Sequence, residues 1–223
     1  MNIISRAEWG ARSPSRPPTP IATPTPRLWL HHTAGALDAG GNGVWWDDVR
    51  GIQNFHIDVR KWIDIGYSFV VGGGKVYEGR GAGIAGGHTE GDNSRSHAIC
   101  LVGDYSWMDP TDRDLAAIVD LTVHGHKNGW WPNQITGGHR DAPGAQTACP
   151  GDRLYARIPD LNRLITARLA APEDDMFDQP DKDKLNATHW LATQANDRVG
   201  RIEALLKEQT RLLEAIAEKH GVD

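Results

Sequence analysis

The stretch Gly138-His139-Arg140-Asp141-Ala142-Pro143-Gly144-Ala145-Gln146-Thr147-Ala148-Cys149-Pro150-Gly151 holds a histidine and a cysteine ten positions apart, in a segment made mostly of Gly, Pro, Ala and Thr. Such a loop has little apolar surface to bury, so its polar residues are not explained by packing. A neutral imidazole and a thiolate are both good zinc ligands. The stretch therefore offers two candidate metal ligands, His139 and Cys149.

A third candidate ligand lies far upstream, in Leu28-Trp29-Leu30-His31-His32-Thr33-Ala34-Gly35, where an apolar strand-like run ends in two histidines. Three protein ligands with an open fourth position are the catalytic arrangement of zinc. The alternative is a buried cysteine with histidines as ordinary polar groups, which would suffice for either histidine alone. The combination favours a zinc site built from His31 or His32, His139 and Cys149.

These stretches and several others resemble the zinc-dependent N-acetylmuramoyl-L-alanine amidases of the peptidoglycan-recognition-protein type (amidase type 2), which include many phage endolysins. The order and approximate spacing of the motifs match over about residues 1 to 170. One departure is a loop from His139 to Cys149 that is longer by a couple of residues, around 144–146. The matching segments are residues 4–11, 30–34, 64–69, 87–88, 99–103, 138–141 and 147–151.

The resemblance implies that zinc activates water for hydrolysis of the amide joining muramic acid to L-alanine. In the family motif the first histidine of the strand-end pair is the ligand, which implies His31. Because residues alternate faces on a strand, His32 is then expected to point the other way, into packing.

The resemblance also assigns roles around the metal. Tyr67 and Thr147 are implied as hydrogen-bond donors to the developing oxyanion, and His88 as a contact to the sugar or peptide. The alternatives are a core aromatic for Tyr67, a turn-forming hydroxyl for Thr147 and a solvated loop histidine for His88. The general base stays open: cell-wall-recycling relatives often carry Glu where this chain has Cys100, which we interpret as a small buried apolar residue.

Two other functions compete with hydrolysis of this amide. Some members of the family only bind peptidoglycan, and those typically lack the cysteine ligand, so Cys149 favours hydrolysis. A zinc peptidase acting within the stem peptide would use different ligand motifs, and no His-x-x-x-Asp pair fits better.

The composition is that of an ordinary globular chain, and 223 residues suffice for one core with an appendage. No apolar run approaches the ~20 residues of a membrane span, and the N-terminus lacks the pattern of a secretory signal. Two cysteines make no disulfide framework. We therefore expect synthesis in a reducing host cytoplasm, and the resemblance to phage endolysins implies that a separate membrane-permeabilising protein releases the enzyme to the cell wall.

Charge and composition change near residue 170. Through residue 172 there are 17 basic and 17 acidic residues, and after it 7 and 12, which gives the net charge of −5. Nothing resembles a basic nucleic-acid footprint. We predict a catalytic domain over residues 1–170, an acidic linker over 171–184 and a helical segment over 185–223.

Periodicity along the catalytic domain predicts alternating strands and helices, which favours an α/β fold. The resemblance implies a central mixed sheet flanked by helices, with zinc in a groove. Residues 13–26 are proline-rich and predict an extended surface connection. The Gly-rich segment 35–43 is either a groove wall or a plain connector, and 81–91 is a loop carrying His88. The predicted strands are 27–32, 66–71, 75–78, 97–102 and 135–137, and the predicted helices are 44–62, 112–127 and 152–169.

A seven-residue repeat runs through the C-terminal segment. Eight of its ten seam positions are apolar, which predicts a coiled coil through which residues 185–219 self-associate. The alternative is a single amphipathic helix lying on the catalytic domain. The seam positions are Leu185, Ala192, Val199, Leu206 and Leu213 on one side and Thr188, Ala195, Ile202, Gln209 and Ile216 on the other.

Overall fold

The computed structural model describes residues 1–35, 45–171 and the single position Gln209. The chain divides between Ala171 and Pro172 into two units, and the elements below belong to the first. The predicted linker, the heptad repeat and most of the Gly-rich segment 35–43 lie outside the described residues.

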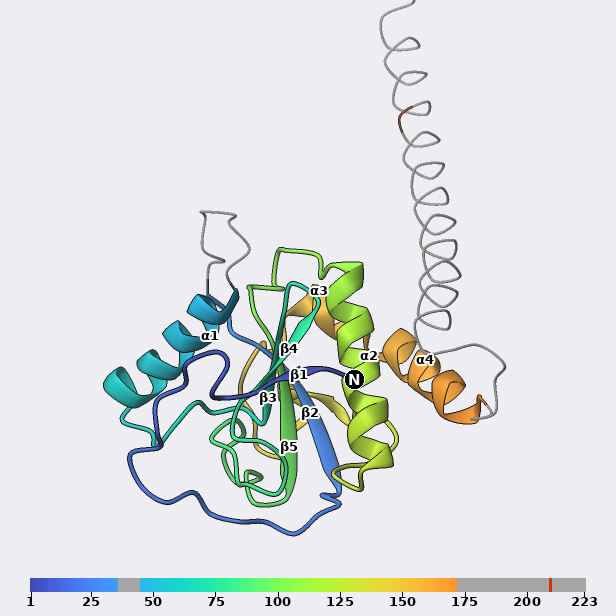
Figure 1. Ribbon diagram of the computed structural model, residues 1–223. Helices are drawn as coiled ribbons and strands as arrows, with labels where there is room; N and C mark the ends of the chain where they lie inside the picture. The colour runs from blue at the N-terminus through green and yellow to red at the C-terminus, as the bar shows by residue number, and fades with distance from the viewer. Residues whose placement is uncertain (36–44, 172–208, 210–223) are drawn as a thin grey trace, which may run out of the picture. The chain divides into compact units, whose positions relative to one another are not determined.

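A mixed six-stranded sheet forms the centre of the first unit (Figure 1). Its strand order is β1-β4-β3-β5-β2-β6, and only β3 and β4 are antiparallel among the neighbouring pairs. The strands are β1 (Ile3–Ile4), β2 (Arg27–His32), β3 (Phe69–Gly72), β4 (Lys75–Glu78), β5 (Ser96–Leu101) and β6 (Gly137–Gly138). The predicted mixed sheet is confirmed.

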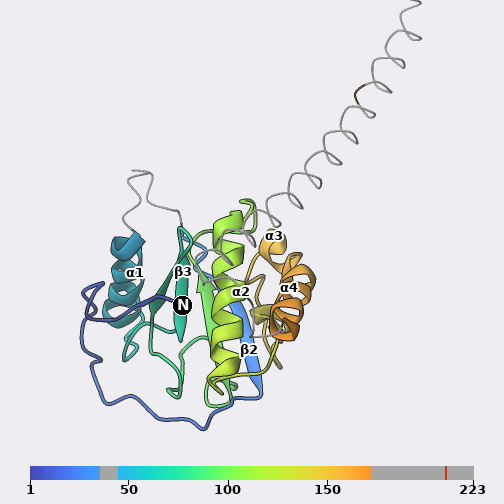
Figure 2. The same cartoon turned by 45° about the vertical axis from the view of Figure 1, so that its right-hand side comes forward.

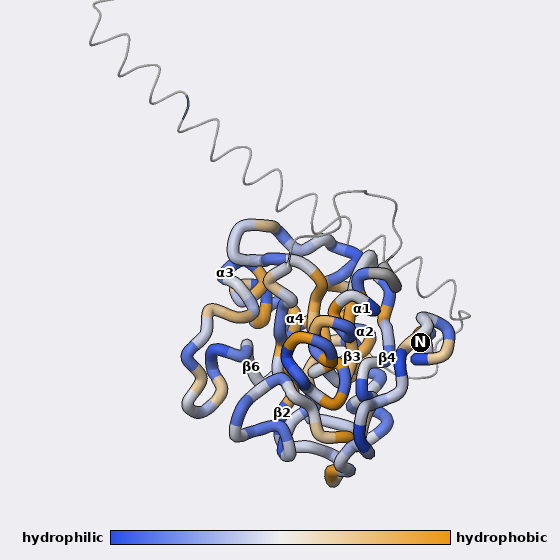
Figure 3. Tube along the Cα trace, turned by 90° about the vertical axis from the view of Figure 1, so that its left-hand side faces the viewer, coloured by the Kyte–Doolittle hydropathy of each residue, from blue (hydrophilic) through white to orange (hydrophobic). Residues whose placement is uncertain are grey.

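Helices cover both faces of this sheet (Figure 2). Helices α2 (Asp112–Lys127) and α4 (Ile158–Ala170) lie on one face, and α1 (Trp45–Asn54) with the π-helix Phe55–Val59 lies on the other. Apolar side chains form one core cluster on each face, and Figure 3 shows hydrophobic residues gathered in the central elements. The larger cluster includes Leu28, Leu30, Ile118 and Ile165, and the smaller includes Val49, Val70 and Tyr77.

The alternation along β2 decides which side chains face which layer. Leu28 and Leu30 point into the larger cluster under α2 and α4. Trp29 and His31 therefore point to the opposite face, towards α1. The groove described below opens on that face.

Helix α2 has the predicted bounds because its first turn is capped. The hydroxyl of Thr111 accepts the N–H of Asp114 at 3.3 Å and donates to its carboxylate at 2.6 Å. This cap satisfies a backbone donor that has no partner within the helix. The carboxylate also accepts the N–H of Gly74, which ties α2 to the turn between β3 and β4.

The predicted helix over residues 152–169 is wrong in its continuity. It is broken into α3 (Asp152–Tyr155) and α4, with Pro159 in the first turn of α4. Proline has no N–H and its ring clashes with the preceding turn, so it is tolerated where a helix begins but not inside one.

Two predicted strands are displaced. The strand predicted from residue 66 begins only at Phe69, because the N–H of Gly66 donates to Nδ1 of His56 instead of to a neighbouring strand. The strand predicted at 135–137 lies instead at Gly137–Gly138 (β6). The side-chain amide of Asn162 bonds both backbone groups of Ile135, which keeps Ile135 out of the sheet.

Candidate metal centre

The two histidines that end β2 point to opposite faces, as predicted. His31 is buried and lies in register with Cys100 on β5. The ring of His32 turns away, and its Nδ1 accepts the N–H of Tyr105 at 3.2 Å. This backbone bond gives His32 a packing role and leaves His31 as the strand-end histidine that faces α1.

Two glycines allow the loop with the other candidate ligands to approach β2. Gly137 and Gly138 form β6, which pairs directly with Trp29 and Leu30. A Cβ at Gly138 would lie 2.5 Å from the Cδ of Pro150, closer than two carbons can approach. The absence of a side chain here lets the segment around Cys149 pack against the end of the sheet.

Hydrogen bonds then close the loop at its base. The N–H of Arg140 donates to the carbonyl of Cys149 at 2.9 Å. Asp141 accepts the N–H of Gly138 and the hydroxyl of Tyr155, both at 2.9 Å. The guanidinium of Arg140 lies over the Tyr155 ring at 4.6 Å. These contacts hold His139 and Cys149 beside β2.

His31, His139 and Cys149 come together at this point. One ligand atom from each can be chosen so that all three lie within 4.8 Å of one another. The rings of His31 and His139 are 4.6 Å apart between centroids, and Sγ of Cys149 lies 3.6 Å from Nδ1 of His31. Among residues 1–35 and 45–171 this is the only such group of histidine, cysteine and acidic side chains.

The protonation states of His31, His139 and Cys149 suit the binding of a divalent cation. Burial lowers the pKa of His31 well below its ordinary value, with His88 and His139 adding to the effect. Burial also lowers the pKa of His139 and raises that of Cys149 to about 11, although the N–H of His32 donates to its sulfur at 3.4 Å. Two neutral imidazoles and one thiol match the ligand chemistry of zinc.

Tyr67 lies beside the three candidate ligands. Its ring centroid is 5.5 Å from that of His31. Burial, followed by the sulfurs of Cys100 and Cys149, raises the pKa of its phenol well above the usual value, so the hydroxyl keeps its proton at neutral pH. Cys100 is fully buried and burial raises its pKa too, which agrees with its interpretation as a small buried residue.

Thr147 is exposed at the rim of the same site. Its hydroxyl oxygen accepts the N–H of Cys149 at 3.1 Å, so it does shape the turn as the alternative interpretation expected. The hydroxyl proton is not used in this bond. A donor role towards substrate is therefore compatible with the turn.

His88 is not a solvated loop histidine, because it is only 6% exposed. Its ring lies 5.3 Å from that of His31, and burial lowers its pKa to about 3. Its Nδ1 lies 2.9 Å from the hydroxyl of Thr89, a buried neighbour that the sequence did not single out. Nothing in the local pattern marks a lone threonine after a histidine as functional.

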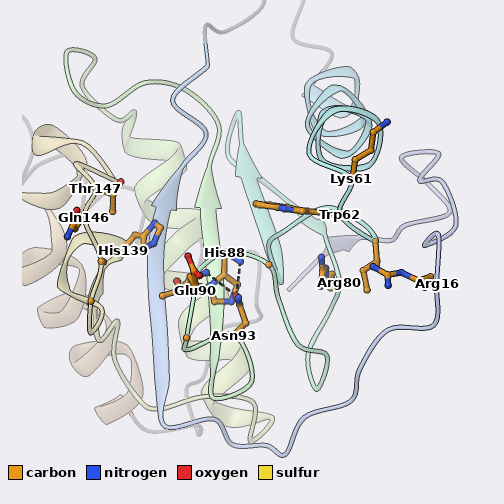
Figure 4. Close-up of a pocket in the computed structure, with 16 residues that line it drawn as sticks. Arg16, Lys61, Trp62, Arg80, His88, Glu90, Asn93, His139, Gln146 and Thr147 are labelled. Carbon is orange, nitrogen blue, oxygen red and sulfur yellow. Dashed lines mark hydrogen bonds between the residues drawn. The ribbon is translucent and has the colours of Figure 1, made fainter.

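A groove of about 920 Å³ is lined on this side by His88, Thr89, His139 and Thr147. In Figure 4, His139 and Thr147 lie at one end, Arg16 and Lys61 at the other, and His88 with Asn93 between them. Trp62 forms part of the wall and stacks on His56, with ring centroids 4.5 Å apart. The groove therefore extends from His139 to Arg16 and Lys61, beyond the candidate metal centre. Within the described residues, no helix has the length and apolar character needed to cross a membrane.

Comparison with known proteins finds N-acetylmuramoyl-L-alanine amidases and peptidoglycan-recognition proteins as relatives. A family model described as N-acetylmuramoyl-L-alanine amidase (Amidase_2) matches residues 22–152. The N-acetylmuramoyl-L-alanine amidase of Sus scrofa is 36% identical over 175 residues, which are 75% of this chain and 29% of that protein. Peptidoglycan-recognition protein SC2 of Drosophila simulans is 34% identical over 160 residues, which are 71% of this chain and 85% of that protein.

A solved structure shares the fold. A point mutant of Drosophila PGRP-LB, in complex with tracheal cytotoxin, superposes with a TM-score of 0.64 at 34% identity, covering 70% of this chain and 92% of that chain. This chain thus spans most of the insect proteins but less than a third of the mammalian amidase.

Proposed function

The chain belongs to the Amidase_2 family of N-acetylmuramoyl-L-alanine amidases, and on that premise we propose that it hydrolyses the amide bond between N-acetylmuramic acid and L-alanine in bacterial peptidoglycan. The observation that carries the proposal is Cys149 beside His31 and His139, with His139 lining the groove. Members that only bind peptidoglycan are expected to lack this cysteine.

In the proposed reaction, His31, His139 and Cys149 hold one zinc ion. When bound, zinc would activate water for attack and polarise the scissile carbonyl. The two imidazoles are already neutral because burial lowers their pKa. The thiol of Cys149 must give up its proton when the metal binds.

Tyr67 and Thr147 would stabilise the negative charge that develops on the carbonyl oxygen. Tyr67 keeps its phenolic proton because burial raises its pKa, so it is available as a donor. The Thr147 hydroxyl is exposed at the groove and keeps its proton free. A preorganised donor of this kind stabilises the transition state more than the ground state.

A second candidate function is binding without hydrolysis. Insect relatives are named for peptidoglycan recognition, and one solved relative is in complex with tracheal cytotoxin, a monomeric diaminopimelic acid-type peptidoglycan. The groove of this chain would suit a ligand of that kind. Hydrolysis is expected to require Cys149, whereas binding alone is not.

Digestion of purified peptidoglycan separates these functions. We expect new N-terminal L-alanine groups without new reducing sugar ends, and the Cys149→Ser variant should lose both the activity and the stoichiometric zinc. Cleavage inside the stem peptide would indicate a peptidase, and binding without any cleavage would indicate a recognition module. New reducing ends without new amines would indicate a glycosidase.

We also propose that the hydrolysis serves cell-wall lysis of the phage-endolysin type, which rests on the sequence resemblance. Expression in a bacterial host with and without a membrane-permeabilising protein tests this role. Lysis is expected only when both proteins are present and should disappear with Cys149→Ser. Intact cells in every combination would contradict the lytic role without touching the amidase activity measured on purified wall.

A further inference from the structure

A short chain of buried polar groups lies behind His31. Its Nε2 is 3.4 Å from the hydroxyl oxygen of Thr89, which in turn is 2.9 Å from Nδ1 of His88. Only 1% of His31, 1% of Thr89 and 6% of His88 is exposed. Water therefore does not compete for these contacts, and the three side chains must satisfy one another.

The loop that carries Thr89 is fastened to the strand that carries His31. The side-chain oxygen of Asn93 accepts the backbone N–H groups of His88 and Thr89 at 2.8 and 2.9 Å (Figure 4). Asp92 accepts the indole N–H of Trp29 at 2.7 Å and forms an ion pair with Arg27. Both partners of Asp92 lie on β2, so the hydroxyl of Thr89 is held at a fixed place relative to His31.

The number of available protons sets the direction in which these hydrogen bonds are donated. A threonine hydroxyl has one proton to donate. Nδ1 of His31 faces Cys149 and must offer a lone pair to a metal, so the proton of the neutral ring sits on Nε2 and is donated to Thr89. The hydroxyl proton of Thr89 is then donated to Nδ1 of His88, whose own ring proton sits on Nε2.

The reverse direction would leave a proton on Nδ1 of His31 and block the metal. The forward direction leaves Nδ1 of His31 free on the side that faces Cys149. It places the ring proton of His88 on Nε2, a buried nitrogen that has no hydrogen-bond partner among the described residues.

We propose that Thr89 is a positioning residue whose hydroxyl links His88 to His31 and fixes the tautomer in which Nδ1 of His31 is free for the metal. This rests on the proposed function only through the assignment of His31 as a ligand. A partner on the second nitrogen is what orients metal-binding histidines in general. His88 then contributes through His31, because its Nδ1 contacts Thr89 and its Nε2 is buried.

Nitrogen NMR of the ring atoms in the full-length, unsubstituted protein tests the direction without any mutation. Couplings between ring nitrogens and ring protons identify which nitrogen carries the proton. We expect the proton on Nε2 of both His31 and His88, in the chelated protein and in the zinc-loaded protein. A proton on Nδ1 of His88 in either form would overturn the proposal.

Zinc affinity, measured by competition with a chelator, tests the hydroxyl itself. Thr89→Val keeps the shape and removes the hydroxyl, and should weaken zinc binding by about 10- to 100-fold. Thr89→Ser keeps the hydroxyl and should restore most of the affinity. Equal affinity in Thr89→Val and the unsubstituted chain would overturn the proposal, and so would a Thr89→Ser variant as weak as Thr89→Val.

Thr122→Val is the matched control, because its buried hydroxyl donates to the carbonyl of Ile118 inside α2. It should lose stability but not zinc affinity. Both readouts are taken without peptidoglycan. If zinc affinity depends on the Thr89 hydroxyl but the protein does not cleave peptidoglycan, only the amidase activity is refuted. If the protein cleaves peptidoglycan but its zinc affinity does not depend on that hydroxyl, only the role of Thr89 is refuted.

Discussion

Burial governs each polar side chain around the candidate metal centre. Tyr67 keeps its proton because burial raises the pKa of its phenol, whereas His31 and His139 are uncharged, each with one ring nitrogen unprotonated, because burial lowers the pKa of the imidazoles. The same low-polarity surroundings thus supply a donor and two lone pairs side by side.

Removing the two proposed oxyanion donors should affect turnover and not metal binding. We expect Tyr67→Phe and Thr147→Ala each to lower the rate of amide hydrolysis by about 10²-fold, since each loses a donor to the transition state. Zinc content, measured by metal analysis, should stay at that of the unsubstituted chain.

Tyr77→Phe provides the control for the tyrosine change. The hydroxyl of Tyr77 is buried on β4 and meets no hydrogen-bond partner among the described residues. Its removal should leave turnover unchanged. If Tyr67→Phe also turns over normally, the role carried over from the family is wrong.

At the scale of elements, β6 and the loop after it determine whether the ligands can meet. β6 consists of two glycines, and the side chains that would replace their hydrogens have no room next to Asp141 and Pro150. The sheet therefore sets the distance between His31 and the loop, and the glycines permit that distance.

Gly138→Ala should separate the loop from β2. The added Cβ would lie 2.5 Å from Pro150 and 3.0 Å from the ring of Tyr155, so the loop must shift. Overpacking of this kind costs about 1–3 kcal/mol of stability, and zinc affinity should fall as well. Denaturant unfolding and chelator competition measure the two effects.

Gly51→Ala is the matched control in α1, where an added Cβ meets nothing within 4 Å. There the change should raise stability by about 0.5–1 kcal/mol, because glycine is a poor helix former. Zinc affinity should not move. A Gly138→Ala variant that binds zinc normally would show that the loop has more freedom than the contacts indicate.

At the scale of the whole molecule, buried neutral histidines make the first unit sensitive to acid. Burial lowers the pKa of His97 and His56 to about 4, and both are almost fully buried. In the unfolded chain their pKa is about 6.5, so between pH 6.5 and 4 the unfolded state binds more protons. Stability is fully present above this window and is lost as the pH falls through it.

Unfolding of the chelated protein at pH 7 and pH 5 measures the combined loss from all buried histidines, to which we expect His97 and His56 to contribute about 2 kcal/mol each. His97→Gln should flatten the dependence, because His97 accepts the N–H of Gly83 and contacts Thr25 as a neutral ring. Parallel pH profiles for the two proteins would contradict the assignment of the loss to His97.

The predicted coiled coil also belongs to this scale and stays a prediction, since residues 185–219 lie almost wholly outside the described part. The repeat predicts that the full chain self-associates and that a version ending at Ala171 is monomeric. Light scattering on both at micromolar concentration decides this. If both versions are monomeric, the alternative of a single amphipathic helix lying on the catalytic domain is favoured.

The amino-acid sequence by itself determined the features that depend on near neighbours. The strand Arg27–His32 and the helix Asp112–Lys127 were predicted at both ends, because alternation and capping involve residues only a few positions apart. The break before α4 could have been predicted from Pro159 alone. The apolar pattern continues across the break and therefore predicted a single helix. The candidate ligand types came from the same local reading, together with the family resemblance.

Only the tertiary structure decided how these pieces meet. His31 and Cys149 are separated by 118 positions and come within 3.6 Å because β2 lies between β5 and β6. The contact of Thr89 with both His31 and His88 depends on Asp92 reaching the side chains of β2, which no local pattern encodes. Strand order and buried hydrogen-bond chains are set by packing between distant segments, and that packing energy is not contained in any short stretch of the chain.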